Sequence, residues 1–343
     1  MGRAASRASR AAFRAAPVRV RVPATSANLG PGFDALGLAL TLYDDVVVRV
    51  AEAGLYVDVA GEGADSVPRT RRHLVVRALH SGFAALGGQP RGLEVVCANR
   101  IPHGRGLGSS AAAIVAGLLA ARALVLGGEE TLDDAALLGL AAELEGHPDN
   151  VAACLLGGLT LAWTEDAGRG RAGRAAAGSA GPPDPDPDGG GPARRTSTRA
   201  VRLPVHPGLR PVAFVPAGTS STTRARRLLP GSVPHPDAAH NAGRAALLVH
   251  ALAADPALLL PATEDRLHQP YRAPALPRTA GLVEALRAGG VPAVVSGAGP
   301  TVLAFAGPAD DLTPYAPRGW SVEVLAVDQG GAELLALDAQ PGS

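Results

Sequence analysis

The sequence predicts an α+β protein with two domains, and three observations lead to this fold class. The chain has 343 residues, 47% of them hydrophobic, so it can bury a sizeable core and exceeds the usual length of one compact domain. Strand-like and helix-like patterns alternate along it without an obvious internal repeat. A low-complexity stretch over residues 167–199 interrupts this alternation, and we expect the domain boundary near that stretch or just after it.

The first half of the chain carries both kinds of element. Strands are indicated by β-branched residues in partial alternation, as in VRVRV at 18–22. One helix is predicted to start from Thr131, because Asp133 and Asp134 then fall in its first turn, where acidic side chains suit the helix dipole. The predicted strands span 18–22, 44–50, 92–98 and 157–163, and the predicted helices span 73–86, 109–126 and 132–145.

The second half gives another mixed unit. Its predicted strands span 209–216, 292–299, 300–307 and 321–327, and its predicted helices lie near 236–254 and 278–288. We therefore divide the chain into a disordered tail at 1–17, an N-terminal domain at 18–166, an insert at 167–199 and a C-terminal domain at 200–335.

Composition excludes several classes of function. Only 3% of the residues are aromatic, so platforms for stacking single-stranded nucleic acid would be hard to build, and we expect no nucleic-acid partner. The longest apolar run, Ala111 to Ala121, is well short of the roughly 20 residues that span a membrane. Cys97 and Cys154 show neither a disulfide framework nor metal-ligand spacing. These features predict a soluble protein of a reducing compartment.

The charges are unevenly distributed. All 32 basic residues are arginines, and ten of them lie in the tail and the insert. The other 22 stand against 28 acidic residues, so the folded body is mildly acidic. The tail is rich in Arg, Ser and Ala and lacks acids, which is also typical of an organellar transit peptide. We favour a disordered tail because the insert, which is too polar to fold, shares its compositional bias.

The most informative segment is IPHGRGLGSSAAAIVAGLLAA, at 101–121. Glycines at 104, 106 and 108 allow backbone N–H groups to turn toward one point. Ser109 and Ser110 follow, where a helix begins with unpaired amides and the positive end of its dipole. This pattern predicts a phosphate-binding loop. The helix behind the loop is apolar on every side, so we expect it to be buried.

Other motifs do not match these letters. A Walker A loop requires a lysine, and the chain has none. The spacing G-x-G-x-G differs from that of dinucleotide-binding loops, and no strand leads to Glu129 and Glu130, the acids that follow about 20 residues later. Neither Ser110 nor Ser296 lies in a G-x-S-x-G nucleophile elbow. A glycine turn capped by serine is the structural alternative.

Two further segments accompany this loop, PATSANLGPGFDALGLAL at 23–40 and VVSGAGPTVLAF at 294–305. Together the three segments closely resemble the motifs of the GHMP small-molecule kinases, and the first is similar to that of homoserine kinases. The resemblance extends over EGHPDNVAACLLGG, STTRARRLLP and EDRLHQPYRAPALP. It covers nearly the whole chain except the tail, the insert and the last few dozen residues.

The resemblance implies a two-domain GHMP kinase fold, with a ribosomal-protein-S5-like N-terminal domain containing a left-handed βαβ unit and a ferredoxin-like C-terminal domain. It implies a cytoplasmic homodimer that uses ATP and Mg²⁺ to phosphorylate the side-chain hydroxyl of L-homoserine in threonine biosynthesis. A mevalonate-like GHMP kinase and a catalytically inactive binding protein of the same fold are the alternatives. The arginine motifs weigh against neutral polyols as substrates, and the intact loop weighs against an inactive protein.

The resemblance also implies residues for the nucleotide and the metal. Ser110 matches the magnesium-coordinating hydroxyl, and Glu143 matches the second magnesium ligand, with Glu145 as a weaker substitute. A cation held by phosphates needs few protein oxygens, so these two suffice. The expected ATP-binding residues are Pro102, His103, Gly104, Arg105, Gly106, Leu107, Gly108, Ser109, Ser110, Ala111 and Ala112.

An amino-acid substrate would be held by its two charged groups. Arg226 and Arg272 match the carboxylate-binding arginines, and a guanidinium suits bidentate capture of a carboxylate. The arginines at 224 and 227 leave the choice of the first one open. Positions 28 and 34 match contacts of the ammonium group, with turn formation as their competing role. The expected substrate-binding residues are Asn28, Asp34, Asn150, Arg226 and Arg272.

Catalysis is implied to rest on positioning, because phosphoryl transfer passes through a loose transition state. Asn150 is expected to orient the reacting hydroxyl. Asp149 matches the aspartate that other GHMP kinases are thought to use as a base, and it is either a base or a structural cap. Arg226 completes the expected catalytic set, and His147 is expected to shape the turn.

Overall fold

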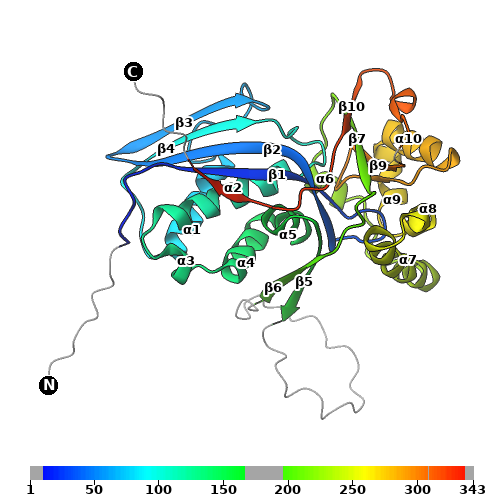
Figure 1. Cartoon of the computed structure of the whole chain (residues 1–343), viewed down its shortest axis with the longest axis horizontal. Helices are drawn as coiled ribbons and strands as arrows, with labels where there is room; N and C mark the ends of the chain where they lie inside the picture. The colour runs from blue at the N-terminus through cyan, green and yellow to red at the C-terminus, as the bar shows by residue number, and fades with distance from the viewer. Residues whose placement is uncertain (1–10, 167–195, 308, 337–343) are drawn as a thin grey trace, which may run out of the picture.

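The structure, a computed structural model, describes residues 11–166, 196–307 and 309–336. Its strands form two sheets (Figure 1). The larger sheet has the order β11–β1–β2–β4–β3, and β5 and β6 extend it because β5 pairs with β2. Its strands are β1 (Val18–Ala27), β2 (Leu36–Ala51), β3 (Gly54–Gly61), β4 (Gly92–Asn99), β5 (Leu159–Asp166), β6 (Thr196–Leu203) and β11 (Glu333–Leu335).

Helices α1 to α5 lie on one face of this sheet, below it in Figure 1. They are α1 (Leu74–Ala85), α2 (Ser109–Leu124), α3 (Gly128–Thr131), α4 (Asp134–Glu145) and α5 (Asp149–Leu156). The parallel strands β3 and β4 are joined through α1, which forms a βαβ unit. α2 packs against α1 and β1, and eleven of its 16 residues are buried. The prediction of a buried helix behind the glycine loop is therefore confirmed.

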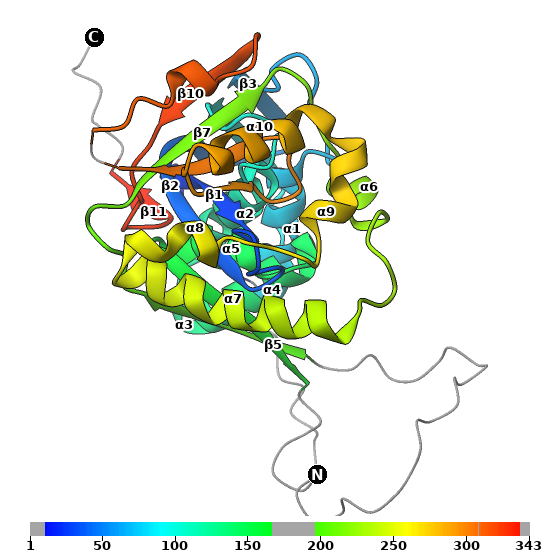
Figure 2. The same cartoon turned by 90° about the vertical axis from the view of Figure 1, so that its right-hand side faces the viewer.

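The smaller sheet is antiparallel, in the order β10–β7–β9–β8. Its strands are β7 (Arg210–Pro216), β8 (Ala293–Val295), β9 (Val302–Ala306) and β10 (Trp320–Val324). The helices of this half, which face the viewer in Figure 2, are α6 (Thr222–Arg226), α7 (His235–Ala253), α8 (Leu259–Ala262), α9 (Gln269–Arg272) and α10 (Pro277–Ala288). Short 3₁₀ helices lie at Pro256–Leu258, Ala273–Ala275 and Thr313–Tyr315. A second apolar core, which includes Phe214, Leu286 and Val302, lies within this half, so the prediction of an α+β class is confirmed.

Part of the predicted tail belongs to the folded body. Phe13 forms a β-bridge with Val125, and its ring packs edge-on against Phe83, with 5.5 Å between the ring centroids. This contact buries apolar surface of both rings, which stabilises the attachment of the segment. The predicted tail therefore ends too late, since residues 11–17 are attached to the body, and residues 1–10 lie outside the described part of the chain.

The strand pairing crosses the predicted boundaries. β6 begins at Thr196, inside the predicted insert, and pairs with β5 of the larger sheet. β11 returns from the predicted C-terminal domain to pair with β1. The end of the insert at 199 is therefore wrong, while its residues 167–195 lie outside the described ones.

The start of the helix predicted from Thr131 is also corrected. Thr131 ends α3, and Asp133 caps α4 by accepting a hydrogen bond from the backbone N–H of Ala136 at 2.8 Å. Several elements were not predicted, among them β3, α3, α5, α6, α8, α9 and β11. Within the described ranges, no helix has the length and hydropathy that crossing a membrane demands.

Candidate active site

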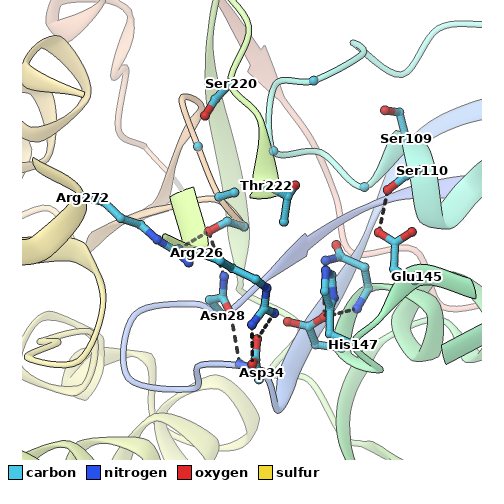
Figure 3. Close-up of a pocket in the computed structure, with 18 residues that line it drawn as sticks. Asn28, Asp34, Ser109, Ser110, Glu145, His147, Ser220, Thr222, Arg226 and Arg272 are labelled. Carbon is cyan, nitrogen blue, oxygen red and sulfur yellow. Dashed lines mark hydrogen bonds and ion pairs between the residues drawn. The ribbon is translucent and has the colours of Figure 1, made fainter. Parts of the chain in front are cut away.

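The candidate active site is a cavity of about 190 Å³ lined by segments from both halves of the chain (Figure 3). The loop before α2 and the junction of α4 and α5 form one side of it. The other side is formed by the β1–β2 connection, by α6 and the residues before it, by α9 and by the β8–β9 connection. The lining residues are Asn28, Asp34, Gly104, Gly106, Gly108, Ser109, Ser110, Glu145, His147, Asp149, Asn150, Ser220, Thr222, Arg226, Arg272, Gly297, Ala298 and Gly299.

The glycine loop packs too tightly for side chains at two positions. Gly106 and Gly108 have φ of +79° and +71°, which other residues rarely adopt. A Cβ on Gly106 would overlap the carbonyl oxygen of Ser296, and a Cβ on Gly108 would overlap the hydroxyl oxygen of Thr25. These glycines let the loop lie directly against β1 and the β8–β9 connection.

The loop uses its carbonyl groups for these contacts. The carbonyls of residues 104 to 107 accept hydrogen bonds from Ser220 N, Thr301 N, Ser296 Oγ and Thr25 N, respectively. Among the described residues, the N–H groups of Gly108, Ser109 and Ser110, where α2 begins, donate to no acceptor. Unpaired amides at the start of a buried helix form a ready anion site, so the geometry supports the predicted phosphate loop.

The predicted nucleotide residues divide into three groups. Gly104, Gly106, Gly108, Ser109 and Ser110 line the cavity. An adjoining cavity of about 240 Å³ shares the two serines and is also lined by His103 and Ala112. The other predicted residues line neither cavity; these are Pro102, Arg105, Leu107 and Ala111.

The acid that faces Ser110 is Glu145, the substitute in the prediction, and not Glu143, the residue that the prediction named first. Ser110 Oγ donates to Glu145 Oε1 at 2.5 Å (Figure 3). Burial raises the pKa of Glu145, although the bond from Ser110 opposes this. Glu143 is exposed on α4 and does not line the cavity. The two side chains diverge because residues two apart in a helix point to nearly opposite sides.

The start of α5 holds a buried polar network. Asp149 is 1% exposed, and its Oδ1 accepts hydrogen bonds from His147 Nδ1 at 2.7 Å and from Asn150 N at 2.8 Å. Burial lowers the pKa of His147, but Asp149 outweighs this through its hydrogen bond and charge, so the pKa is raised. Asn150 Oδ1 accepts from Thr25 Oγ1 at 2.8 Å. The network sets the orientation of both predicted catalytic side chains.

The β1–β2 connection brings the predicted ammonium contacts to an arginine. Asn28 and Asp34 have φ of 69° and 56°. Asn28 Nδ2 donates to Gly297 O at 2.8 Å, and its Oδ1 accepts from Asp34 N at 3.1 Å. The Asp34 carboxylate forms a bidentate pair with Arg226, with distances of 2.6 and 3.0 Å. Arg226 is therefore the arginine of its motif that reaches the cavity, while Arg224 and Arg227 are exposed.

Arg272 is the second predicted arginine in the cavity. Its side chain is almost fully buried, with 2% of the residue exposed. Its guanidinium contacts Gly297 O and His268 Nδ1, each at 3.2 Å, and its Nε has no partner. Among the described residues it forms no ion pair with a carboxylate. Burial lowers its pKa, as does the charge of Arg226. A buried cation in this condition favours an anionic ligand.

Some site residues were not predicted. Ser220 and Thr222 line the cavity, and Thr25 and His268 support it from behind. Thr25 and Thr222 lie within quoted motifs, but hydroxyl residues are common there, and the letters alone did not show which of them reach the cavity. His268 could have been noted, because it lies four residues before Arg272 and such residues are neighbours on a helical turn.

Comparisons with known proteins agree on a family. The chain matches the models for the GHMP kinases N terminal domain, over residues 73–158, and for the GHMP kinases C terminal domain, over residues 243–313. It is 61% identical to homoserine kinase of Streptomyces coelicolor, an alignment that covers 95% of this chain and 97% of that protein. It is 50% identical to homoserine kinase of Clavibacter michiganensis, covering 94% and 95%. The crystal structure of homoserine kinase from Cytophaga hutchinsonii matches with a TM-score of 0.74 at 27% identity, covering 94% of this chain and 98% of that one.

Proposed function

Because this chain belongs to the homoserine kinases of the GHMP kinase family, we propose that its cavity is where the γ-phosphoryl group of ATP passes to the side-chain hydroxyl of L-homoserine. The reaction yields ADP and O-phospho-L-homoserine, a step of threonine biosynthesis. One observation supports this location above the others. A single cavity contains an amide cradle for phosphate together with arginine and aspartate side chains suited to a zwitterion.

The triphosphate is proposed to lie along the N–H groups of the loop before α2. The adjoining cavity, which shares Ser109 and Ser110, is lined largely by apolar groups such as Val67, Leu74 and Ala113. An aromatic base gains from such a lining. We therefore assign the nucleoside to this second cavity and the transferred phosphate to the first.

Mg²⁺ fits beside Ser110 and Glu145. The carboxylate is half-buried and has a hydroxyl partner but no arginine partner among the described residues. No group of three or more His, Cys, Asp or Glu side chains in the described ranges could hold a metal alone. A hard cation that binds phosphates needs only one or two protein oxygens, so Ser110 and Glu145 would hold it once ATP is present. When bound, the cation neutralises charge on the phosphates.

The substrate would be held by its charged ends. Arg272, buried and without a carboxylate partner, is proposed to bind the homoserine carboxylate together with Arg226. Asp34 and the carboxamide of Asn28 are proposed to bind the ammonium group. These residues would select amino acids over neutral polyols, because a polyol has no charge to pair with the buried guanidinium of Arg272.

In the transfer step, the hydroxyl oxygen attacks the γ-phosphorus, the bond to the β–γ bridging oxygen breaks, and the hydroxyl proton departs. Asn150, oriented by Thr25, is proposed to hold that hydroxyl. Asp149 Oδ1 is engaged by His147 and by the Asn150 amide, which leaves Oδ2 as the oxygen that would take the proton. Asp149→Asn separates the role of base from that of structural cap. Asparagine cannot take the proton, so turnover is lost if Asp149 is the base. It keeps an oxygen that accepts the hydrogen bonds, so turnover persists if Asp149 is only a cap.

The experiment that tests the function is coupled ATP turnover with homoserine, mevalonate, galactose and shikimate. We expect selective turnover of homoserine. Selective turnover of mevalonate would favour the mevalonate-like alternative, and no turnover with any of them would favour an inactive binding protein. We also propose that the chain acts as a homodimer in the cytoplasm, as its family resemblance implies. Light scattering after gel filtration tests the dimer, and fractionation of cells tests the location.

A further inference from the structure

We infer that homoserine itself opens the Asp34–Arg226 ion pair, with its ammonium replacing Arg226 at Asp34 and its carboxylate replacing Asp34 at Arg226. The inference rests on the function proposed for this cavity and adds a rule of selection to it. The site would discriminate against hydroxy acids that lack an amino group, even though it contains two arginines.

The pair occupies the two groups that a zwitterion needs. Both carboxylate oxygens of Asp34 accept from the guanidinium of Arg226, at 2.6 and 3.0 Å (Figure 3). Each side chain is about one third exposed, at 36% and 37%, and both line the cavity. Without a ligand, therefore, neither group is available, and among the described residues that line the cavity only Arg272 offers an unpaired positive charge to an anion.

One half of the pair is held more firmly than the other. Asp34 lies in the left-handed region with φ of 56°, and its N–H donates to Asn28, which is tied to Gly297. Arg226 ends the five-residue helix α6, and its guanidinium rests over the ring of Phe33 at 5.5 Å from the centroid. We therefore expect Arg226 to swing away when the pair opens, while the Asp34 carboxylate stays in place.

The two arginines are poised around one aromatic ring. The guanidinium of Arg272 also lies 5.5 Å from the centroid of Phe33. A carboxylate that bridges both guanidiniums would sit beside this ring, close to the carboxylate of Asp34. The like charges of the ligand and Asp34 would then oppose each other, since Asp34 would have lost its partner.

Charge balance makes the exchange specific. A ligand with only a carboxylate takes Arg226 from Asp34 and leaves that aspartate uncompensated. A ligand with only an ammonium takes Asp34 and leaves Arg226 uncompensated. Homoserine supplies both charges, so every group keeps a partner after the exchange.

Two half-ligands test this rule. 4-Hydroxybutyrate is homoserine without its ammonium, and 3-aminopropan-1-ol is homoserine without its carboxylate. Asp34→Asn frees Arg226, so we expect the dissociation constant of 4-hydroxybutyrate, measured by titration calorimetry, to fall about 2- to 5-fold, as suits a partly exposed pair. The same variant should lose about 10- to 150-fold in kcat/KM for homoserine, because its ammonium loses a charge-assisted contact.

A mirrored variant covers the case in which Asp34→Asn does not fold. Arg226→Gln frees Asp34, so 3-aminopropan-1-ol should bind about 2- to 5-fold more tightly. Asp45→Asn is the matched control, because Asp45 also pairs with arginines, at 3.1 and 3.3 Å, but lies outside the cavity lining. Asp45→Asn should leave the dissociation constants of both half-ligands unchanged.

The outcomes separate the inference from the proposed function. If either variant binds its half-ligand with unchanged or lower affinity, then Asp34 and Arg226 act as independent contacts and the exchange is refuted. If the wild-type chain does not phosphorylate homoserine, the proposed function fails, and the inference fails with it.

Discussion

Replacing Glu145 with glutamine is the sharpest test of the metal site, and Glu143→Gln is its matched control on the same helix. Glutamine keeps an oxygen that can accept from Ser110 Oγ, so the lost feature is one negative charge. A charge-assisted contact contributes about 1.5 to 3 kcal/mol, so kcat/KM for ATP should fall about 10- to 150-fold. Glu143 is exposed, and its substitution should change the rate less than about threefold.

The assay is coupled turnover over a range of Mg²⁺ concentrations, with thermal melting in parallel. Because burial raises the pKa of Glu145 in the folded state, its contribution to stability is greatest at acidic pH and is lost as the pH rises through that raised value. At neutral pH Glu145→Gln should therefore melt no lower than the wild type, which separates loss of turnover from unfolding. Full turnover in Glu145→Gln, or a large loss in Glu143→Gln, would refute this assignment of the metal ligand.

Three further substitutions test other parts of the site. Arg272→Met should raise the KM for homoserine about 10- to 150-fold and leave the KM for ATP nearly unchanged, and equal effects on both would contradict its carboxylate role. Gly108→Ala places a Cβ against Thr25 and strains a backbone with positive φ. It should therefore cost about 1 to 3 kcal/mol of stability and raise the KM for ATP. If neither effect is measured, the loop is loosely packed and the reasoning is wrong. His147→Gln removes a group whose folded pKa is raised above its ordinary value of 6.5. The stability that this group contributes is present at acidic pH and is lost as the pH rises through the raised value. Above pH 6.5 the melting temperature of the variant should therefore depend less on pH than that of the wild type. The same pH dependence in both proteins would contradict the pair with Asp149.

The glycine loop and the buried helix behind it were predictable from sequence because their pattern is local. Alternating glycines and a helix start lie within ten residues, and the structure needs no distant information to form them. The arginines and Asp34 were also found, through motifs that lie far apart in the chain. What the motifs could not reveal is that Asp34 and Arg226 pair with each other, since that depends on how two connections from different halves meet.

The choice between Glu143 and Glu145 shows where sequence reasoning stopped. Both acids lie near the end of one helix, and their spacing alone does not reveal which faces the cavity. Gly146 ends α4 with a positive φ of 89°, so Glu145 is its last residue and lies where the chain turns toward α5. β6 and β11 were misassigned for a related reason, because their partners lie in distant segments and pairing across such distances leaves no local pattern.

The site contains the side chains of Glu145 and Arg272, neither of which has an oppositely charged group at contact distance within the described part of the chain. Glu145 faces a hydroxyl, and Arg272 faces a carbonyl and an imidazole. Burial of either charged side chain costs free energy unless a bound ligand supplies the opposite charge. In the proposed complex, Mg²⁺ on ATP would supply the partner for Glu145, and the homoserine carboxylate would supply the partner for Arg272. Ligand binding should therefore raise the melting temperature most when nucleotide and amino acid are both present, because only then are both buried charges compensated.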